Sequence, residues 1–275
     1  MSTNALDLNN LRLAVLIDAE NVPRNCIKSV MEEIAIYGTP TIKRIYGDWT
    51  SPTISGWKYS LLENAITPIQ QYSYTTGKNS SDSAMIIDAM DILYSDKTDG
   101  FVIVSSDSDF TRLAIRLREA GQRVIGIGER KTPNAFIAAC DKFTYIEVIR
   151  ADGEESAHDR ESLSGEDGEN GQKTQTQHRE KLYYQQARTR GVKVPGTVVQ
   201  LIADSVADLA GDSGAVFMGE LGNLILKKQP DFDHRNFGYM SLSAMIKSID
   251  RFEIDFRQTT DPNIKHVFVR DKEAN

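Results

Sequence analysis

Four aspartates stand where apolar strands end or a helix begins. Asp18 closes the run AVLID, and Asp107 closes the equally apolar run FVIVSSD, with Asp109 two residues later. Asp82 opens a helical pattern after the loop TTGKNSS. In an open parallel sheet, ligands collect outside the carboxyl ends of the strands, where the strand order reverses. If the first and fourth strands are neighbours there, the four side chains face one crevice.

Carboxylates that share a crevice need a cation or protons to compensate their charge. Two like charges about 4 Å apart repel by about 4 kcal/mol at an effective dielectric near 20. Oxygen ligands without histidine or cysteine favour Mg²⁺ or Mn²⁺, and such sites act on phosphate esters. The pattern predicts a phosphoryl-transfer or nuclease site, with the metal held by Asp18, Asp82 and Asp107 and assistance from Asp109.

The N-terminal part of the chain lacks the residue types and motifs that several other kinds of catalytic site require. The first histidine of the chain is His158, which excludes Ser-His-Asp triads and histidine-bound zinc before that point. The two cysteines, Cys26 and Cys140, form no C-x-x-C motif. No G-x-x-x-x-G-K-[ST] loop occurs, and GIGERK lacks the third glycine of a dinucleotide fingerprint.

The acids also have an explanation that needs no metal. Asp82 suits a helix N-terminus electrostatically, while Ser106 and Asp109 have the spacing of a capping box. Taken singly, each acid favours capping, because caps are common in α/β proteins. Taken together, the four acids favour the metal site, which Ser105 and Ser106 can support by hydrogen bonding.

Three further side chains are candidates for substrate binding. Lys78 can pair with a phosphate or be a solvated loop residue. Asn21 can orient the substrate or cap the helix that follows it. Ser106 lies beside the acids at the end of its strand. Asp88 follows Asp82 by six residues, about 240° around an ideal helix, so we expect Asp88 outside the pocket.

Strand and helix patterns alternate over residues 11–149, and this alternation positions the acids. We expect strands at 11–18, 41–49, 67–74, 100–107, 122–129 and 143–149, and helices at about 22–37, 55–65, 80–95, 109–120 and 133–141. Such alternation predicts an α/β fold, a doubly wound and mostly parallel sheet covered by helices on both faces.

The composition of the 275-residue chain is that of a globular protein, 40% hydrophobic and 26% charged. No signal peptide is visible, and no apolar run approaches the ~18 residues that cross a bilayer. Because the cysteine usage fits a reducing compartment, we predict a cytoplasmic protein without a membrane partner. The net charge of −7 means that any nucleic-acid binding is local or helped by metal ions.

A polar segment divides the chain. Residues 151–180 carry nine acidic and three basic side chains and one large hydrophobe, too few apolar groups to offset the entropy of ordering. The tract KLYYQQARTRGVKVP then adds basic charge and two stackable tyrosines. We therefore predict a domain at 1–150, a flexible acidic linker with a basic end at 151–195, and a second domain at 196–275.

The second domain predicts three helices and a hairpin. The helices are in GTVVQLIADSVADLAG, FMGELGNLILKKQPDF and MSLSAMIKSI, and the strands FEIDF and KHVFVRD flank the turn-rich RQTTDPNI. This is a small winged-helix (α+β) arrangement. The MSLSAMIKSI helix would enter a nucleic-acid groove; alternatively, the acidic module docks a protein partner.

Three motifs resemble a known family. LAVLIDAENV, GKNSSDSAMIIDAMDIL and GFVIVSSDSDFTRLAIRLREAGQRVIGIG, over about residues 11–149, closely resemble the NYN domain, a branch of the PIN-like nucleases that includes the LabA-like proteins. The resemblance implies a metal-dependent ribonuclease whose acids correspond to Asp18, Asp82, Asp107 and Asp109. Asn21 matches the asparagine of the first motif, whose usual D-G-x-N is DAEN here.

The C-terminal sequence VFMGELGNLILKKQPDFDHRNFGYMSLSAMIKSIDRFEI, followed by HVFVRD, resembles the LOTUS module, also called OST-HTH, a winged-helix domain implicated in RNA or protein binding. NYN and LOTUS domains commonly share a chain. The two resemblances imply an Mg²⁺- or Mn²⁺-dependent (endo)ribonuclease that acts on RNA, above all single-stranded RNA, in processing or decay.

Two other functions compete with this expectation. One is a catalytically inactive adaptor that binds RNA or protein. The other is a phosphatase with an aspartate nucleophile, although DAEN lacks the D-x-D motif of that family. Metal-dependent cleavage of single-stranded RNA separates the nuclease from the adaptor, and phosphate release from small esters would indicate the phosphatase.

Overall fold

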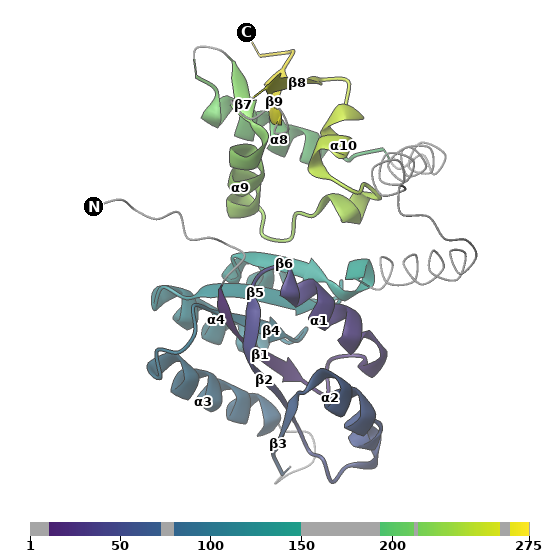
Figure 1. Cartoon of the computed structure of the whole chain (residues 1–275), viewed down its shortest axis with the longest axis vertical. Helices are drawn as coiled ribbons and strands as arrows, with labels where there is room; N and C mark the ends of the chain where they lie inside the picture. Colours follow the sequence, from purple (N-terminus) through teal and green to yellow (C-terminus); the bar gives the residue numbers. More distant parts are fainter. Residues whose placement is uncertain (1–10, 73–79, 150–192, 212–213, 259–264, 275) are drawn as a thin grey trace, which may run out of the picture. The chain divides into compact units, whose positions relative to one another are not determined.

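A computed structural model of the chain describes residues 11–72, 80–149, 193–211, 214–258 and 265–274. The chain divides into two compact units, Met1–Glu161 and Ser162–Asn275 (Figure 1). Each unit has hydrophobic core residues of its own. All but the last three residues of the predicted linker lie outside the described residues, so the linker and its boundaries stay a prediction.

The first unit is built on a six-stranded sheet in the order β3-β2-β1-β4-β5-β6, and every neighbouring pair is parallel. Its strands are β1 (Arg12–Asp18), β2 (Thr39–Gly47), β3 (Thr67–Gln70), β4 (Gly100–Val104), β5 (Arg123–Gly128) and β6 (Lys142–Tyr145). The predicted doubly wound parallel sheet is confirmed. The chain winds outward in opposite directions from β1 and β4, so the strand order reverses between these neighbours, as a shared crevice requires.

Helices cover both faces of this sheet, as Figure 1 shows for α1 and α2 on one face and α3 and α4 on the other. The helices are α1 (Ile27–Ala35), α2 (Lys58–Asn64), α3 (Ser80–Tyr94), α4 (Thr111–Glu119) and α5 (Asn134–Ala139). Short 3-10 turns, η2 (Arg24–Cys26), η3 (Pro52–Trp57) and η4 (Ser108–Phe110), precede α1, α2 and α4. Because the sheet is covered twice, all five residues of β4 are buried.

The expected strand at 143–149 is wrong in its second half, because residues 146–149 are helical. Val148 and Ile149 are adjacent and both buried, whereas side chains alternate between faces in a strand. A short apolar run does not distinguish a buried strand from a buried helical turn. At the other edge, the expected strand at 67–74 ends at Gln70, and Gln71 and Tyr72 are not in a strand.

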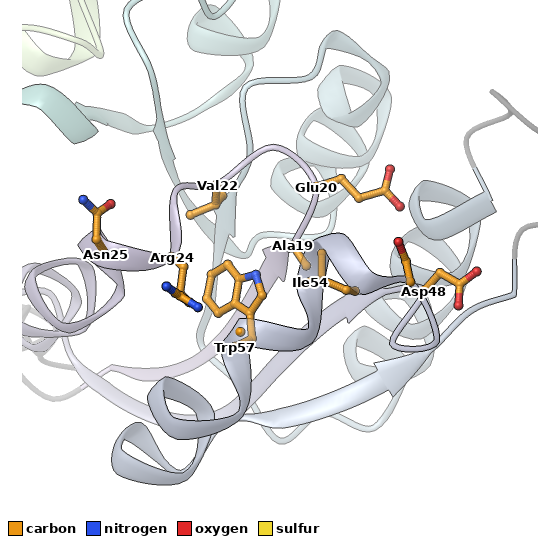
Figure 2. A pocket seen from close by; sticks show the side chains of 10 residues that line it. Ala19, Glu20, Val22, Arg24, Asn25, Asp48, Ile54 and Trp57 are labelled. Carbon is orange, nitrogen blue, oxygen red and sulfur yellow. The ribbon is translucent and has the colours of Figure 1, made fainter.

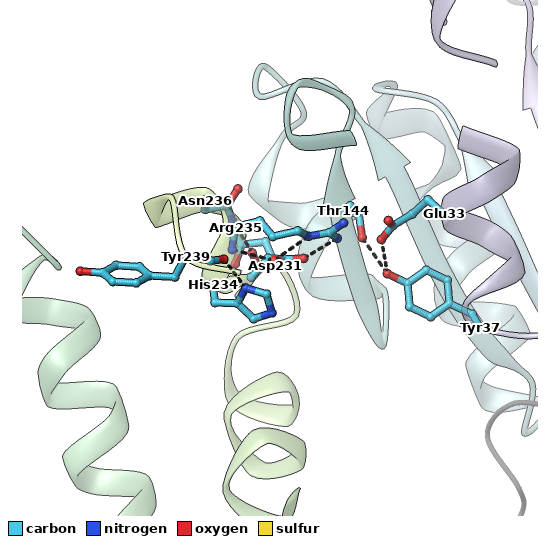
Figure 3. A network of polar contacts seen from close by, with 9 residues as sticks. Glu33, Tyr37, Thr144, Asp231, His234, Arg235, Asn236 and Tyr239 are labelled. Carbon is cyan, nitrogen blue, oxygen red and sulfur yellow. Dashed lines mark hydrogen bonds and ion pairs between the residues drawn. The ribbon is translucent and has the colours of Figure 1, made fainter. Parts of the chain in front are cut away.

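A polar contact ties the end of the α1 region to the edge strand β6. The hydroxyl of Tyr37 donates to Glu33 Oε1 at 2.5 Å and lies 3.3 Å from Thr144 Oγ1 (Figure 3). Glu33 is buried, and a buried carboxylate is costly without such a donor. The contact therefore satisfies the buried acid of α1 and fixes the helix against the sheet.

In its described residues, the second unit combines three helices with a three-stranded antiparallel sheet in the order β7-β9-β8. Its elements are α8 (Gly196–Leu209), β7 (Ala215–Phe217), α9 (Met218–Lys228), η5 (His234–Phe237), α10 (Leu242–Lys247), β8 (Phe252–Gln258) and β9 (Lys265–Asp271). This is the predicted winged-helix fold. Strand β7 was not expected from the sequence, because three residues before a helix carry too little periodicity to indicate a strand.

Side-chain and backbone contacts hold the short segments between α9 and β8. His234 Nδ1 lies 2.7 Å from the carbonyl oxygen of Tyr239, and Asn236 Nδ2 donates to the carbonyl oxygen of Asp231 at 3.1 Å (Figure 3). Ser241 caps α10 by accepting from the Ala244 amide at 3.1 Å.

Candidate metal centre at the carboxyl edge of the sheet

Three of the four predicted acids converge beyond the carboxyl ends of β1 and β4. Asp82 lies in the first turn of α3, Asp107 precedes η4, and Asp109 lies within it. One carboxylate oxygen from each lies within 4.8 Å of the others. Asp18, the last residue of β1, stands outside this group of three but acts on Asp82 through its charge. The pairing of β1 with β4 brings Asp18 to the same edge of the sheet as Asp107 and Asp109.

Asp18 is buried, with 1% of its surface exposed, and three donors fix its carboxylate. Ser105 Oγ donates to Oδ2 at 2.9 Å, Asn21 Nδ2 donates to Oδ2 at 2.7 Å, and the Glu20 amide donates to Oδ1 at 3.0 Å. The predicted support by Ser105 is therefore present. The helix-capping alternative for Asn21 is wrong, because Pro23 occupies the N-cap of η2 without a side-chain cap.

Asp107 caps a helical turn and also belongs to the acid cluster, so it can serve both of the roles that the sequence left open. It is the N-cap of η4, where its Oδ1 accepts from the Asp109 amide at 2.9 Å, and its own amide donates to Ser105 Oγ at 3.1 Å. The capping box of Ser106 with Asp109 is wrong, because Ser106 Oγ accepts from the Glu129 amide at 2.8 Å. Ser106 thus links the ends of β4 and β5.

Asp82 carries the electrostatic signature of the cluster. The pKa of its carboxyl is raised to about 6, first by burial and then by the charges of Asp18, Asp107 and Asp109 in that order, with a last contribution from Glu20. Only 7% of its surface is exposed. A carboxyl whose pKa is raised this far by neighbouring acids indicates a site that favours binding of a cation.

The cluster fits a hard divalent cation. Its three members are graded in exposure, with Asp82 buried, Asp107 half-buried and Asp109 exposed, so an ion can enter from the solvent side. The donors are carboxylate oxygens alone, the set that Mg²⁺ and Mn²⁺ accept, whereas structural zinc favours nitrogen and sulfur.

Two other predicted residues lie elsewhere. The carboxylate of Asp88 accepts from Arg44 and from the hydroxyl of the buried Tyr46. It connects α3 to β2, outside the acid cluster, as the helical angle predicts. Lys78 lies outside the described residues, so its role stays a prediction.

A pocket that the sequence did not indicate lies at the same edge of the sheet as the acid cluster. It has a volume of about 880 Å³. Figure 2 shows it between the loop after β1 and the η3 turn. The lining residues are Ala19, Glu20, Val22, Arg24, Asn25, Asp48, Ser51, Ile54, Gly56 and Trp57. Glu20 lines this pocket, and its charge also contributes, as the smallest cause, to the raised pKa of Asp82. Two of the pocket's residues, Ala19 and Glu20, come from the DAEN segment, the signal that could have located it.

Comparisons with known proteins agree with this architecture. The family model of the NYN domain matches residues 12–147, and that of the OST-HTH/LOTUS domain matches residues 193–264. No curated protein matches the chain.

Two solved structures are similar to parts of the chain. A crystal structure of a protein of unknown function from Vibrio parahaemolyticus is 19% identical over 53% of this chain and 96% of its own, with a TM-score of 0.43. A solution NMR structure of an uncharacterized protein from Nitrosomonas europaea is 29% identical over 31% of this chain and 86% of its own, with a TM-score of 0.26.

Proposed function

We propose that this chain, which belongs to the NYN domain family through residues 12–147 and carries an OST-HTH/LOTUS domain at residues 193–264, is a metal-dependent ribonuclease. NYN domains are generally nucleases. One observation carries the finer proposal, namely that oxygens of Asp82, Asp107 and Asp109 lie within 4.8 Å of one another at the point where the strand order reverses.

The cluster would hold one or two Mg²⁺ or Mn²⁺ ions through Asp82, Asp107 and Asp109. When bound, such an ion polarises a phosphoryl oxygen and lowers the pKa of a water molecule. Asp18 supplies a fixed negative charge behind the cluster, since Ser105 and Asn21 hold its carboxylate in one orientation. Asp82 has to lose its proton before it can act as a ligand, so its raised pKa makes site assembly pH-dependent.

The second unit would choose the RNA. OST-HTH/LOTUS domains bind RNA, and a binding module on the same chain raises the effective concentration of target near the cleavage site. We propose single-stranded RNA as the substrate. We propose a cytoplasmic location, supported by the two cysteines, Cys26 and Cys140, which are both free and buried. None of the helices in the described part combines the length and apolar character that crossing a membrane requires.

The test is cleavage of a single-stranded RNA, labelled at both ends, by the purified full chain in Mn²⁺, Mg²⁺ and EDTA. We expect cleavage with either ion, none in EDTA, and at least about a hundredfold loss in Asp107→Asn, the size of effect typical of a group that stabilises charge at the reacting centre. Asp91→Asn, at an exposed acid of the same unit, controls for the loss of one charge. Cleavage of a circular RNA would show endonucleolytic attack.

Two results would contradict the proposal. The first is cleavage that survives EDTA or the Asp107→Asn substitution, which would place the chemistry elsewhere. The second is RNA binding without cleavage under any metal, which would favour an adaptor. Phosphate release from small esters without RNA cleavage would instead indicate a phosphatase.

A further inference from the structure

The pocket, which we call the Arg24 pocket and define by the ten lining residues given above, lies at the same carboxyl edge of the sheet as the acid cluster. Its first lining residue, Ala19, directly follows Asp18 in the chain, and Glu20 contributes to both sites. The pocket spans the ends of β1 and β2, while the acids gather at the ends of β1 and β4. A polynucleotide that crosses the carboxyl edge of the sheet passes both sites.

Among the described residues that line this pocket, Arg24 is the one cation. Within the described part of the chain, its guanidinium makes no ion pair or hydrogen bond. Of the two acids that line the pocket, Glu20 and Asp48, the second has its Oδ1 already accepting from the Thr50 hydroxyl at 2.5 Å and from Gln70 Nε2 at 2.9 Å. The guanidinium is therefore available to an anion from solution, and its planar fork matches a phosphate.

The position of this guanidinium depends on a glycine. A Cβ at residue 56 would lie 1.7 Å from Arg24 Nη1 and 2.9 Å from Cζ, so the side chain occupies space that only glycine leaves open. Figure 2 shows Arg24 next to Trp57, which is 3% exposed and forms a rigid wall. Arg24 is itself exposed, so its guanidinium can reach a ligand from solution while its tip lies over Gly56.

We infer that the Arg24 pocket holds the nucleotide next to the scissile bond, with the Arg24 guanidinium bound to a phosphodiester of single-stranded RNA. This inference rests on the proposed ribonuclease function. Asn25 supplies donor and acceptor groups for a base edge. The volume of about 880 Å³ lies within the range of ligand pockets, roughly 300–1,000 Å³.

Three substitutions test the inference. Arg24→Ala removes charge and fork, Arg24→Lys keeps the charge alone, and Gly56→Ala displaces the guanidinium without removing it. The obstruction created by Gly56→Ala meets only the end of a flexible side chain, so the fold should tolerate it. Arg123→Ala is the matched control, since Arg123 is exposed at the start of β5, the opposite edge of the sheet.

The first measurement is the KM and kcat of the full chain on a short single-stranded RNA in Mn²⁺. Losing one charge-assisted phosphate contact should reduce kcat/KM by about tenfold to a hundredfold, chiefly through KM. We expect the full effect in Arg24→Ala, a smaller one in Arg24→Lys and Gly56→Ala, and none in Arg123→Ala. Unchanged melting temperatures would show that each variant folds.

The second measurement is binding of the same RNA by fluorescence anisotropy at several salt concentrations, with every variant carrying Asp107→Asn to prevent cleavage. Removal of one phosphate contact from a single strand should reduce the slope of log K against log salt by about 0.7. A purely structural role for Arg24 would leave this slope unchanged. Arg24→Lys should keep most of the slope.

The outcomes separate the pocket from the nuclease. If the wild type cleaves RNA and Arg24→Ala matches Arg123→Ala in KM and in salt slope, the pocket inference is overturned and the nuclease stands. If the wild type does not cleave RNA but Arg24→Ala still lowers the slope, the proposed nuclease falls and the phosphate site stands. Absence of both cleavage and binding overturns both.

Discussion

Replacing Asp82 by asparagine should stabilise the metal-free protein at neutral pH while weakening the metal site. The surroundings of Asp82 raise its pKa from 3.8 to about 6. Because the pKa is raised, the charged form of Asp82 destabilises the folded state. A carboxyl whose pKa is higher in the folded state favours folding at low pH, and that contribution is lost as the pH rises through about 6. The substituted asparagine carries no charge at any pH, so this destabilisation is absent from the variant.

The size of the effect follows from the shift. A rise of the pKa from 3.8 to about 6, at about 1.36 kcal/mol per pKa unit, sets an upper limit of ~3 kcal/mol. Water at the exposed side of the cluster, where Asp109 lies, reduces this to about 1–2 kcal/mol. The loss of an acid from the first turn of α3 offsets about 0.3–1 kcal/mol. A net gain of about 1 kcal/mol raises the melting temperature of a unit of this size by about 2–4 °C.

The assay is thermal unfolding in EDTA at pH 8 and at pH 5, followed by tryptophan fluorescence. Both tryptophans, Trp49 and Trp57, lie in the first unit, so the signal reports that unit alone. The melting temperature of Asp82→Asn should exceed that of the wild type at pH 8, and the difference should fall to about half at pH 5, which lies between the unfolded pKa of 3.8 and the folded pKa of about 6.

A lower melting temperature for Asp82→Asn at pH 8 would refute the reasoning, because burial and repulsion would not then dominate at this position. An equal difference at both pH values would show that the change does not act through the carboxyl charge. Asp91→Asn, at an exposed acid of the same helix, should change the melting temperature little at either pH.

Three further predictions concern the metal, the support of Asp18 and the independence of the units. A hundredfold excess of Mn²⁺ over its dissociation constant should stabilise the wild type by about 2.7 kcal/mol. This stabilisation should shrink below pH 6 and in Asp107→Asn. Thermal melting measures it, and melting curves that Mn²⁺ leaves unchanged would contradict a metal site. Ser105→Ala should lower the free energy of unfolding, measured in urea, by about 1–3 kcal/mol, because it leaves the partners of a fully buried hydroxyl without their hydrogen bonds. The same substitution should impair cleavage more than Ser106→Ala, which breaks only the contact with the Glu129 amide. Since the units have separate cores, residues 1–161 expressed alone should unfold cooperatively at the temperature of the same unit in the full chain, and failure to fold would contradict the division.

The positions of the acids could be predicted because strand ends are local features of the sequence. Asp18 and Asp107 each end an apolar run, and the structure places both at the same edge of the sheet. The same logic failed for residues 146–149, where hydrophobicity identifies burial but not backbone conformation. It also misassigned Ser106 to a cap, because its partner, the Glu129 amide, lies 23 residues away in the chain.

The sequence by itself determined the fold class, the order of the elements and which acids stand at the carboxyl edge. Periodicity and chain order are local properties, and in a parallel sheet they decide which residues lie at the same edge. Only the tertiary structure decided what those residues experience. The raised pKa of Asp82 depends on burial and on charges from other segments of the chain. The position of the Arg24 side chain depends on the absence of a side chain at Gly56, which is distant in the sequence. Desolvation and Coulomb interaction act through space, so a pattern along the chain identifies candidates and the packing sets their chemistry.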